Sequence, residues 1–220
     1  MDSYENYCEI SKTIPDDVTL IAVSKTKSIE EMKGAYMAGA RNFGENKVQE
    51  LLEKYDEFHK DVNWHFIGHL QRNKVKYLVG KVTLIQSLDR VSLVNEIERQ
   101  FSKYNMIANC LIEINIGEEE SKSGVIAKDL EELLLEIENC KHLKVYGIMS
   151  VIPKGSKEEN EKYFYKLKEL YDSLKKRKFK NITMELLSMG MTHDYLTAIA
   201  KGSNMVRVGE GIFGKRNYNL

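Results

Sequence analysis

A repeated alternation of short apolar runs with amphipathic helical stretches is the feature that most constrains this chain. Eight runs have strand character, and seven of them are clearly followed by a helical pattern. They lie at residues 18–25, 41–46, 63–68, 82–89, 108–117, 144–152, 182–190 and 205–214. Several are apolar without strict alternation, as expected of strands that are covered on both faces. Strands that alternate with helices predict right-handed crossovers and a parallel sheet.

Eight such units predict the α/β class and a single (β/α)₈ TIM barrel, compact at 220 residues against about 250 in typical barrels. Residues 1–17 would add an extra N-terminal helix before the first strand. The alternative is an open doubly wound sheet, which is disfavoured because no G-x-G-x-x-G pattern follows the first strand. No linker or shift in composition marks a second domain, so residues 1–220 are predicted to form one domain.

Two capping boxes predict where helices begin. Ser28 with Glu31 would open the helix after the first strand, and Ser156 with Glu159 would open a long charged helix that runs to about Lys178. In this motif the serine hydroxyl and the glutamate carboxylate each satisfy a backbone N–H of the first turn.

Composition excludes several classes of function. Lys plus Arg and Asp plus Glu both number 33, so a net charge of zero gives no electrostatic reason to bind nucleic acid or an anionic membrane. No apolar run is long enough to span a bilayer, and the acidic, polar N-terminus is unlike a signal peptide. Cys8, Cys110 and Cys140 lack the number and spacing of a disulfide framework or zinc site. Together these features predict a cytoplasmic protein with no membrane or nucleic-acid partner.

In a barrel the chemistry lies at the carboxyl ends of the strands, and polar residues end most of the apolar runs here. Lys25 ends the first run, IAVSK. A lysine held against an apolar wall has a depressed pKa, and its neutral amine can form a Schiff base. On spacing alone, the interpretation of Lys25 as a surface lysine in a strand-to-helix turn is favoured.

The last two units carry a pattern suited to phosphate. Ser188, Met189 and Gly190 place small residues and backbone N–H groups before a helix, and Arg207 and Gly209 lie in the glycine-rich stretch RVGEGIFG. Barrels commonly bind phosphate in the loops after strands seven and eight, where glycine lets the backbone approach and arginine adds charge. The alternative is ordinary barrel closure with turn glycines.

The histidines predict no metal centre. His65 and His69 are four residues apart, as two zinc ligands on a helix would be. The stretch WHFIG reads instead as a strand with a turn at Gly68, and no third ligand is evident.

Seven stretches, spread in order over nearly the whole chain, resemble the pyridoxal phosphate homeostasis protein family. They are IAVSKTK (21–27), FGEN (43–46), WHFIGHLQRNK (64–74), INIGEEESKSG (114–124), GIMSVIP (147–153), SMGM (188–191) and VRVGEGIFG (206–214). The resemblance implies a single barrel like the N-terminal domain of alanine racemase. It also implies pyridoxal 5'-phosphate (PLP) as cofactor, bound as a Schiff base.

The resemblance also implies a role for each matching residue. Lys25 would be the Schiff-base lysine, and Asn46 would lie near the cofactor ring. Phosphate contacts would come from Ser188, Met189, Gly190, Arg207, Gly209 and Glu210. Glu210 departs from the Ser or Thr that relatives often have, so any phosphate contact there would come from its backbone N–H. Thr192 replaces a common serine and keeps the hydroxyl.

The expected function is to hold PLP as a Schiff base and maintain its intracellular level, without efficient catalysis and without assigned catalytic residues. Two alternatives stay open: a PLP-dependent racemase-like enzyme, and a sugar-phosphate barrel enzyme without cofactor. Racemisation needs a second acid/base across the cofactor from the lysine. Fold-related racemases supply that group from a second domain, for which this chain is expected to have no room. Apo PLP-dependent enzymes are the expected partners, and a monomer is the expected state.

Overall fold

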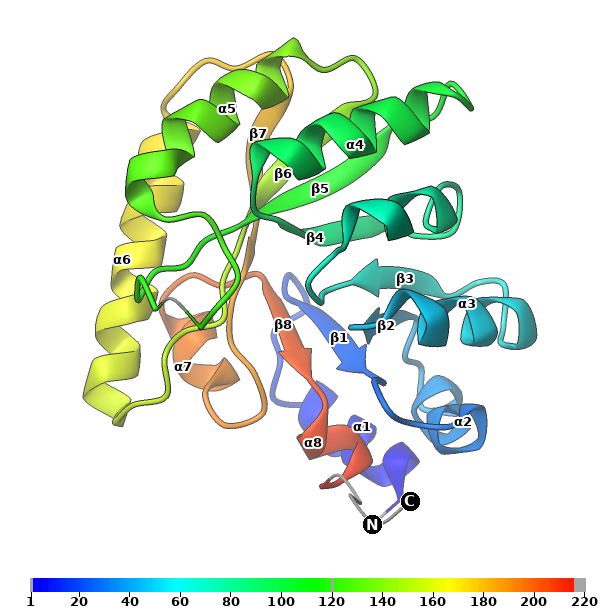
Figure 1. The fold of residues 1–220 in the computed structure, drawn as a ribbon. Coiled ribbons are helices and arrows are strands. Elements are labelled where there is room, and N and C mark those ends of the chain that lie inside the picture. The colour runs from blue at the N-terminus through cyan, green and yellow to red at the C-terminus, as the bar shows by residue number, and fades with distance from the viewer. Residues whose placement is uncertain (1, 120, 216–220) are drawn as a thin grey trace.

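The eight strands close into a parallel barrel in which they follow one another in chain order (Figure 1). The computed structural model describes residues 2–119 and 121–215. The strands are β1 (Thr19–Val23), β2 (Asn42–Glu45), β3 (Asn63–Phe66), β4 (Leu84–Leu88), β5 (Ala108–Glu113), β6 (Leu143–Met149), β7 (Ile182–Ser188) and β8 (Met205–Val208). β1 closes the barrel by pairing with β8, with Leu20 opposite Val206. The predicted TIM barrel is confirmed, and the open doubly wound alternative is wrong.

The predicted extra helix and most of the predicted strand–helix units are also present. The α-helices are α1 (Ser3–Ser11), α2 (Ile29–Met37), α3 (Val48–Glu57), α4 (Val91–Ser102), α5 (Leu130–Asn139), α6 (Lys157–Lys175), α7 (Tyr195–Ala200) and α8 (Glu210–Phe213). Two 3₁₀ helices complete the set, η1 (Arg72–Tyr77) after β3 and η2 (Ala127–Asp129) before α5. η1 stands where a longer helix was expected. Val75 is its one buried residue, so it presents too narrow an apolar face for a full amphipathic helix.

Both predicted capping boxes are confirmed. At the start of α2, Glu31 N donates to Ser28 Oγ over 3.2 Å, and Ser28 N donates to Glu31 Oε2 over 2.7 Å. Ser156 and Glu159 repeat the arrangement at α6 with distances of 3.2 and 2.7 Å. These reciprocal bonds fix the first turn of each helix.

The core has two layers. The larger layer packs the outer faces of the strands against the helices. The smaller layer fills the barrel itself and consists of Ile21, Val23, Leu84, Leu111, Met149 and Met205. Polar side chains share the barrel interior with it, and they determine much of the chemistry described below.

The extra helix α1 packs on α2 and α8 below the barrel in Figure 1. Ser3 Oγ donates to Glu31 O over 2.7 Å, and Asn6 Nδ2 donates to Ile212 O over 3.0 Å. Because α8 directly follows β8, α1 braces the C-terminal end of the barrel wall.

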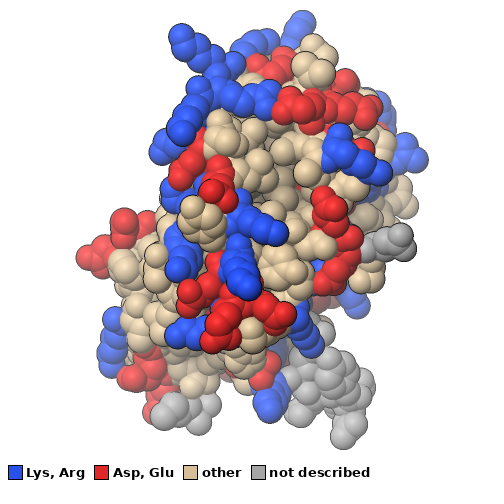
Figure 2. All heavy atoms as spheres, turned by 90° about the vertical axis from the view of Figure 1, so that its left-hand side faces the viewer, with Lys and Arg blue, Asp and Glu red and all other residues tan. Residues whose placement is uncertain are grey.

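The surface shows the charge balance of the composition. Figure 2 shows acidic and basic side chains mixed over the face that carries α5 and α6, with neither sign forming a continuous field. No helix within residues 2–119 and 121–215 combines the length and apolar character that crossing a membrane requires.

Candidate functional site

A cavity of about 640 Å³ opens at the carboxyl ends of the strands, where barrel chemistry is expected. Its apolar lining comes from five side chains on different elements. They are Val23, Ile67, Val151, Met191 and Phe213. Its polar lining comes from Lys25, Lys27, Asn46, Thr192, His193, Arg207, Glu210 and Lys215, and the backbone of Gly209 and Gly214 completes it. This mixture of an apolar wall with a few polar groups is typical of a small-molecule site.

Lys25 lies at the mouth of the barrel, two residues beyond the end of β1, and is half-buried. The predicted lysine therefore reaches the cavity. Lys27, which the sequence interpretation did not select, lines the cavity as well and pairs with Glu31 over 3.1 Å. Both lysines lie in the IAVSKTK stretch, but only Lys25 directly ends the apolar run, so the position of Lys27 at the cavity was not predicted.

Asn46 brings an unsatisfied polar atom to the cavity. It directly follows β2, and its Oδ1 is buried with no hydrogen-bond partner among the residues that the structure describes. A buried acceptor without a partner is costly unless a ligand satisfies it. The predicted position near a cofactor ring is compatible with this geometry.

Arg207 joins the cavity to a chain of polar side chains inside the barrel. Its Nη1 donates to Ser188 Oγ over 2.6 Å and its Nη2 to Ser150 O over 2.8 Å. Ser188 Oγ donates in turn to Gln86 Oε1 over 2.7 Å. Gln86 Nε2 lies 3.3 Å from Nδ1 of His65. Burial lowers the pKa of Arg207 to about 10, so the guanidinium remains charged at neutral pH.

His65 ends this chain of polar side chains. Its Nε2 lies 3.3 Å from Asn42 Oδ1 at the start of β2. Burial lowers the pKa of His65 to about 4, so the ring is neutral near pH 7. His69 has different surroundings: its side chain is exposed and lies 3.6 Å from Asp89. Within residues 2–119 and 121–215, no three potential ligands form a metal-binding group.

The predicted phosphate residues divide into two sets. Gly209 and Glu210 line the cavity together with Arg207. Ser188, Met189 and Gly190 are buried at the end of β7 and form part of its support, because Gly190 O accepts from Arg207 N over 3.0 Å. Their assignment to phosphate, like that of the other site residues, stays a prediction.

A cluster of buried charges beside Lys25 was not anticipated. Lys54 Nζ lies 2.7 Å from both Glu45 Oε1 and Glu50 Oε1, and the Lys54 and Glu45 side chains are almost fully buried. Burial raises the pKa of Glu45 to about 7, although the Lys54 ammonium acts in the opposite direction. The i,i+4 spacing of Glu50 and Lys54 is visible in the sequence. Their meeting with Glu45 depends on the packing of α3 against β2.

A second buried carboxylate, Glu113, ends β5. Burial and the nearby Asp89 raise its pKa to about 7, while Arg207 and Arg90 act to lower it. Its Oε2 has no hydrogen-bond partner among the described residues. Residues 108–117 were expected as one strand, but β5 ends at Glu113. The turn that follows is fixed by Asn115, whose Nδ2 donates to Glu119 O over 2.8 Å.

Comparison with known proteins identifies close relatives of this arrangement. Residues 3–217 match the family described as "Alanine racemase, N-terminal domain". A pyridoxal phosphate homeostasis protein of Aquifex aeolicus (strain VF5) is 41% identical over 220 residues, which cover 99% of this chain and 96% of the relative.

Solved structures extend the comparison to the fold. PipY of Synechococcus elongatus PCC7942, solved with PLP bound, aligns with a TM-score of 0.89 at 29% identity, over 97% of this chain and 100% of PipY. Alanine racemase of Bacillus anthracis aligns with a TM-score of 0.77 at 16% identity, over 99% of this chain and 56% of the racemase. The racemase likeness concerns the fold alone.

Proposed function

Because this chain belongs to the alanine racemase N-terminal-domain family and, within it, to the pyridoxal phosphate homeostasis proteins, we propose that it binds PLP covalently and keeps it in reserve. In this proposal Lys25 carries PLP as a Schiff base, and the protein helps to maintain the PLP level without efficient turnover of its own. The proposal joins the geometry of the cavity to the PLP-bound state of PipY.

The observation that carries the proposal is the set of groups around one cavity. An amine from Lys25, the unsatisfied Oδ1 of Asn46 and the cationic Arg207 all border it. Gly209 lets β8 pack closely against β1 at the cavity wall, since a Cβ there would lie 3.1 Å from Val23 O. A cofactor with an aldehyde, a polar aromatic ring and a phosphate fits these residues.

Each residue would have a separate part in holding the cofactor. PLP, when bound, would supply an aldehyde, and Lys25 would supply the amine that condenses with it. Arg207 remains charged and supplies positive potential from inside the barrel, while Lys27 and Lys215 add cationic groups at the mouth. Such charges favour a phosphate over a neutral ligand.

The polar groups at the mouth support storage rather than turnover. A racemase needs a second, positioned acid/base opposite its lysine. The His193 side chain is 81% exposed and the Glu210 side chain 43% exposed, and they lie 3.8 Å apart. At that separation the two side chains do not fix one another by a hydrogen bond, so they are poorly suited to moving a proton at a fixed atom.

A protein that stores PLP without consuming it could donate PLP to apo PLP-dependent enzymes, and we propose this cellular role. We infer a cytoplasmic monomer, in line with the balanced charge and the three free cysteines, of which Cys110 and Cys140 are buried. The oligomeric state can be measured by sedimentation of the purified protein.

The first test locates the cofactor. Purified protein loaded with PLP should be yellow, and borohydride should fix the pyridoxyl group on Lys25, as peptide mapping would show. Lys25→Ala should lose the visible chromophore while keeping its fold, because it removes one half-buried side chain at the rim. Lys33→Ala, an exposed lysine in α2, is the matched control and should keep the colour. A reduced adduct on another lysine would refute the assignment.

The second test separates a reserve from an enzyme. Loaded protein is mixed with an apo PLP-dependent enzyme, and recovery of that enzyme's activity is followed. In parallel, amino acids are assayed for racemisation and deamination. We expect reactivation in the first assay, and turnover far below the roughly 10 per second typical of enzymes in the second. A robust racemase rate that disappears in Lys25→Ala would instead establish the racemase alternative. If no PLP bound at all, the sugar-phosphate alternative would remain.

A further inference from the structure

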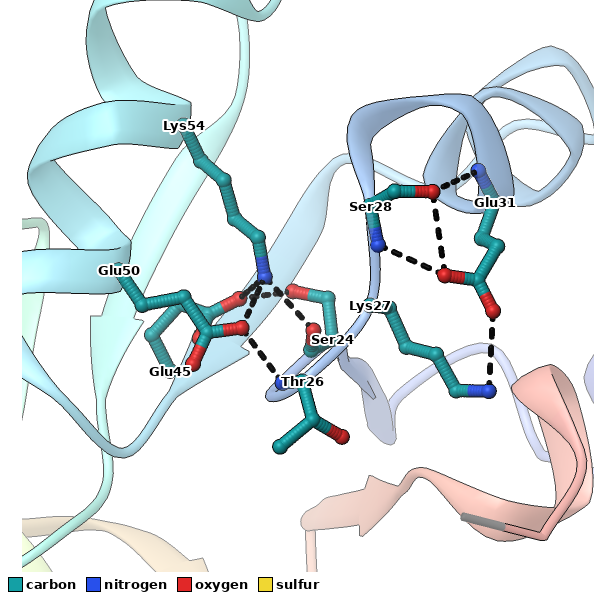
Figure 3. Close-up of polar contacts among 8 residues, drawn as sticks. All are labelled: Ser24, Thr26, Lys27, Ser28, Glu31, Glu45, Glu50 and Lys54. Atoms are coloured by element: carbon teal, nitrogen blue, oxygen red, sulfur yellow. Dashed lines mark hydrogen bonds and ion pairs between the residues drawn. The ribbon is translucent and has the colours of Figure 1, made fainter. Parts of the chain in front are cut away.

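Three charged side chains meet beside the segment that carries Lys25 (Figure 3). Glu45 comes from the end of β2, and Glu50 and Lys54 lie one turn apart on α3. They face the chain between β1 and α2, where Ser24 and Thr26 flank Lys25 on either side.

Lys54 is at the centre of the cluster. Its ammonium donates to Ser24 O over 2.8 Å, to Glu45 Oε1 over 2.7 Å and to Glu50 Oε1 over 2.7 Å. An ammonium has three N–H donors, so these contacts use all of them. Its side chain is only 6% exposed, which leaves little competition from water.

The two carboxylates that bind Lys54 also accept hydrogen bonds from the residues on either side of Lys25. Glu45 Oε1 accepts from Ser24 Oγ over 2.5 Å, and Glu50 Oε1 accepts from the backbone N of Thr26 over 2.5 Å. Ser24 is therefore held at its side chain and its carbonyl, and Thr26 is held at its amide. Every contact described for the Lys54 ammonium ends either on Ser24, next to Lys25, or on a carboxylate that binds Ser24 or Thr26.

The backbone here also needs such support. Thr26 has a φ of +65°, in the left-handed region that residues other than glycine rarely adopt. Conformations of this kind persist where surrounding contacts determine them, and they concentrate at ligand sites. The bond from Thr26 N to Glu50 is a direct contact of that kind.

Packing α3 against the sheet does not by itself explain why charged side chains are buried here. Desolvating a buried ion pair is costly, and apolar side chains of similar volume often pack a helix against a sheet equally well or better. A buried charge is more useful where it fixes particular backbone atoms, because its hydrogen bonds have direction and apolar contacts do not.

We propose that Lys54 is a positioning residue for Lys25: together with Glu45 and Glu50 it fixes the peptide units before and after Lys25 and so directs the Lys25 amine into the cavity. This inference rests on the proposed function, in which Lys25 is the PLP-binding lysine. Loosening the cluster should slow formation of the covalent bond while leaving the noncovalent fit of the cofactor intact.

The test uses two variants of the full-length protein. Glu50→Ala releases Thr26 N and carries a low folding risk, because the Glu50 side chain is 20% exposed. The double variant Lys54→Met with Glu45→Gln removes the two most deeply buried charges together, so that neither is left without the other, and Glu50, whose side chain is 20% exposed, keeps access to water. Glu50→Gln is the conservative variant, since its side-chain oxygen can still accept from Thr26 N.

Two ligands separate positioning from a general effect on the site. The rate of PLP capture by the apo protein is followed by visible absorbance. The Kd of pyridoxine 5'-phosphate, which keeps the ring and phosphate but has no aldehyde, is measured by calorimetry. We expect capture to slow about tenfold in Glu50→Ala and in the double variant, with partial recovery in Glu50→Gln, because rate is sensitive to the approach of the reacting atoms. The Kd of the analogue should stay within about twofold of wild type in all variants, because that ligand makes no covalent bond.

Asp172→Ala is the matched control. Asp172 forms an i,i+4 ion pair with Lys168 on α6, like Glu50 with Lys54, but outside the lining of the cavity. Its capture rate should equal that of wild type.

The outcomes distinguish this inference from the proposed function. Equal losses of capture rate and analogue affinity would show a structural role only and overturn the inference, as would unchanged capture in both variants. If wild-type protein formed no adduct at Lys25, the proposed function would fall, and the inference with it. An intact wild-type adduct with slowed capture in the variants alone would support both.

Discussion

The two sides of the cavity are built in opposite ways. On the β1–β2 side, the chain around Lys25 is held by side-chain charges, with Lys54 bound to both Glu45 and Glu50. On the β7–β8 side, the backbone itself approaches closely. A Cβ at Gly190 would lie 2.6 Å from Ala198 Cβ, and one at Gly209 would lie 3.1 Å from Val23 O.

This difference shows how one site can combine a positioned lysine with closely packed backbone. Charges on the β1–β2 side hold the segment around Lys25 through directed hydrogen bonds, and single substitutions can remove these bonds one at a time. On the β7–β8 side, Gly190 and Gly209 lack side chains where the chain packs closely, so a Cβ added at either glycine meets its neighbours at once. Substitutions in the charged cluster on the β1–β2 side should therefore leave the fold intact but change the rate of PLP capture. Substitutions of the glycines on the β7–β8 side should lower the free energy of unfolding.

The largest expected effect is on the β7–β8 side. Gly190→Ala should lower the free energy of unfolding by about 3 kcal/mol or more, because a left-handed backbone and an overpacked contact each cost about 1–3 kcal/mol. The residue has a φ of +96°, and its new Cβ would also lie 3.0 Å from Tyr195 Cα in α7. Urea unfolding measures the loss.

Gly39→Ala is the matched control for that experiment. Gly39 has a similar φ of +106°, but nothing lies within 4 Å of the Cβ that would be added. Its loss should be about 1 kcal/mol, the cost of backbone strain alone. Equal losses of unfolding free energy in the two variants would show that the close contacts at the end of β7 do not contribute to the cost of Gly190→Ala.

The next effect concerns the polar chain inside the barrel, which links Arg207 on β8 to His65 on β3. Burial holds the pKa of His65 at about 4, below its ordinary value of 6.5. A lowered pKa means that the folded protein favours the neutral ring. Stability from this group is therefore complete above pH 6.5 and is lost as the pH falls towards 4, by up to about 3 kcal/mol.

His65→Gln should remove this acid sensitivity. Wild type and variant are compared by urea unfolding between pH 7 and pH 4, and the difference between their curves isolates the histidine. Subtraction is needed because Glu45 and Glu113 have raised pKa values and so act in the opposite direction on acidification. Parallel curves across this range would mean that His65 does not titrate as its burial requires.

A smaller effect is expected for the charge that borders the cavity from β8. Arg207→Ala should weaken PLP retention about tenfold or more, since a hydrogen bond to a charged group contributes about 1.5–3 kcal/mol. Equilibrium dialysis of loaded protein measures the change. Unchanged retention would remove Arg207 from the binding site and leave it as a bridge between Ser188 and Ser150.

Several features could be read directly from the chain. The order of strands and helices predicted a barrel, because alternation of this kind leaves few alternative topologies. Ser28 with Glu31 predicted a helix start, since a capping box is complete within four residues. Lys25 was predicted from its place after an apolar run, and the structure brings it to the cavity.

Features that depend on distant segments could not be read in this way. η1 replaced an expected helix because too little of it is buried, and burial is a property of the packed barrel. The contact of Ser188 with phosphate stays a prediction, and the structure adds that its hydroxyl lies between Arg207 and Gln86. Gln86 lies 102 residues away along the chain, and no local pattern records such a meeting.

The sequence by itself determined the barrel, its helix starts and the strand ends at which the site would lie, because each of these follows from local periodicity and short-range hydrogen bonding. Only the tertiary structure decided which charges meet. Glu45, Glu50 and Lys54 converge on Ser24 and Thr26 because α3 packs against the strand ends, and a buried ion pair forms only where folding brings its members together and excludes water.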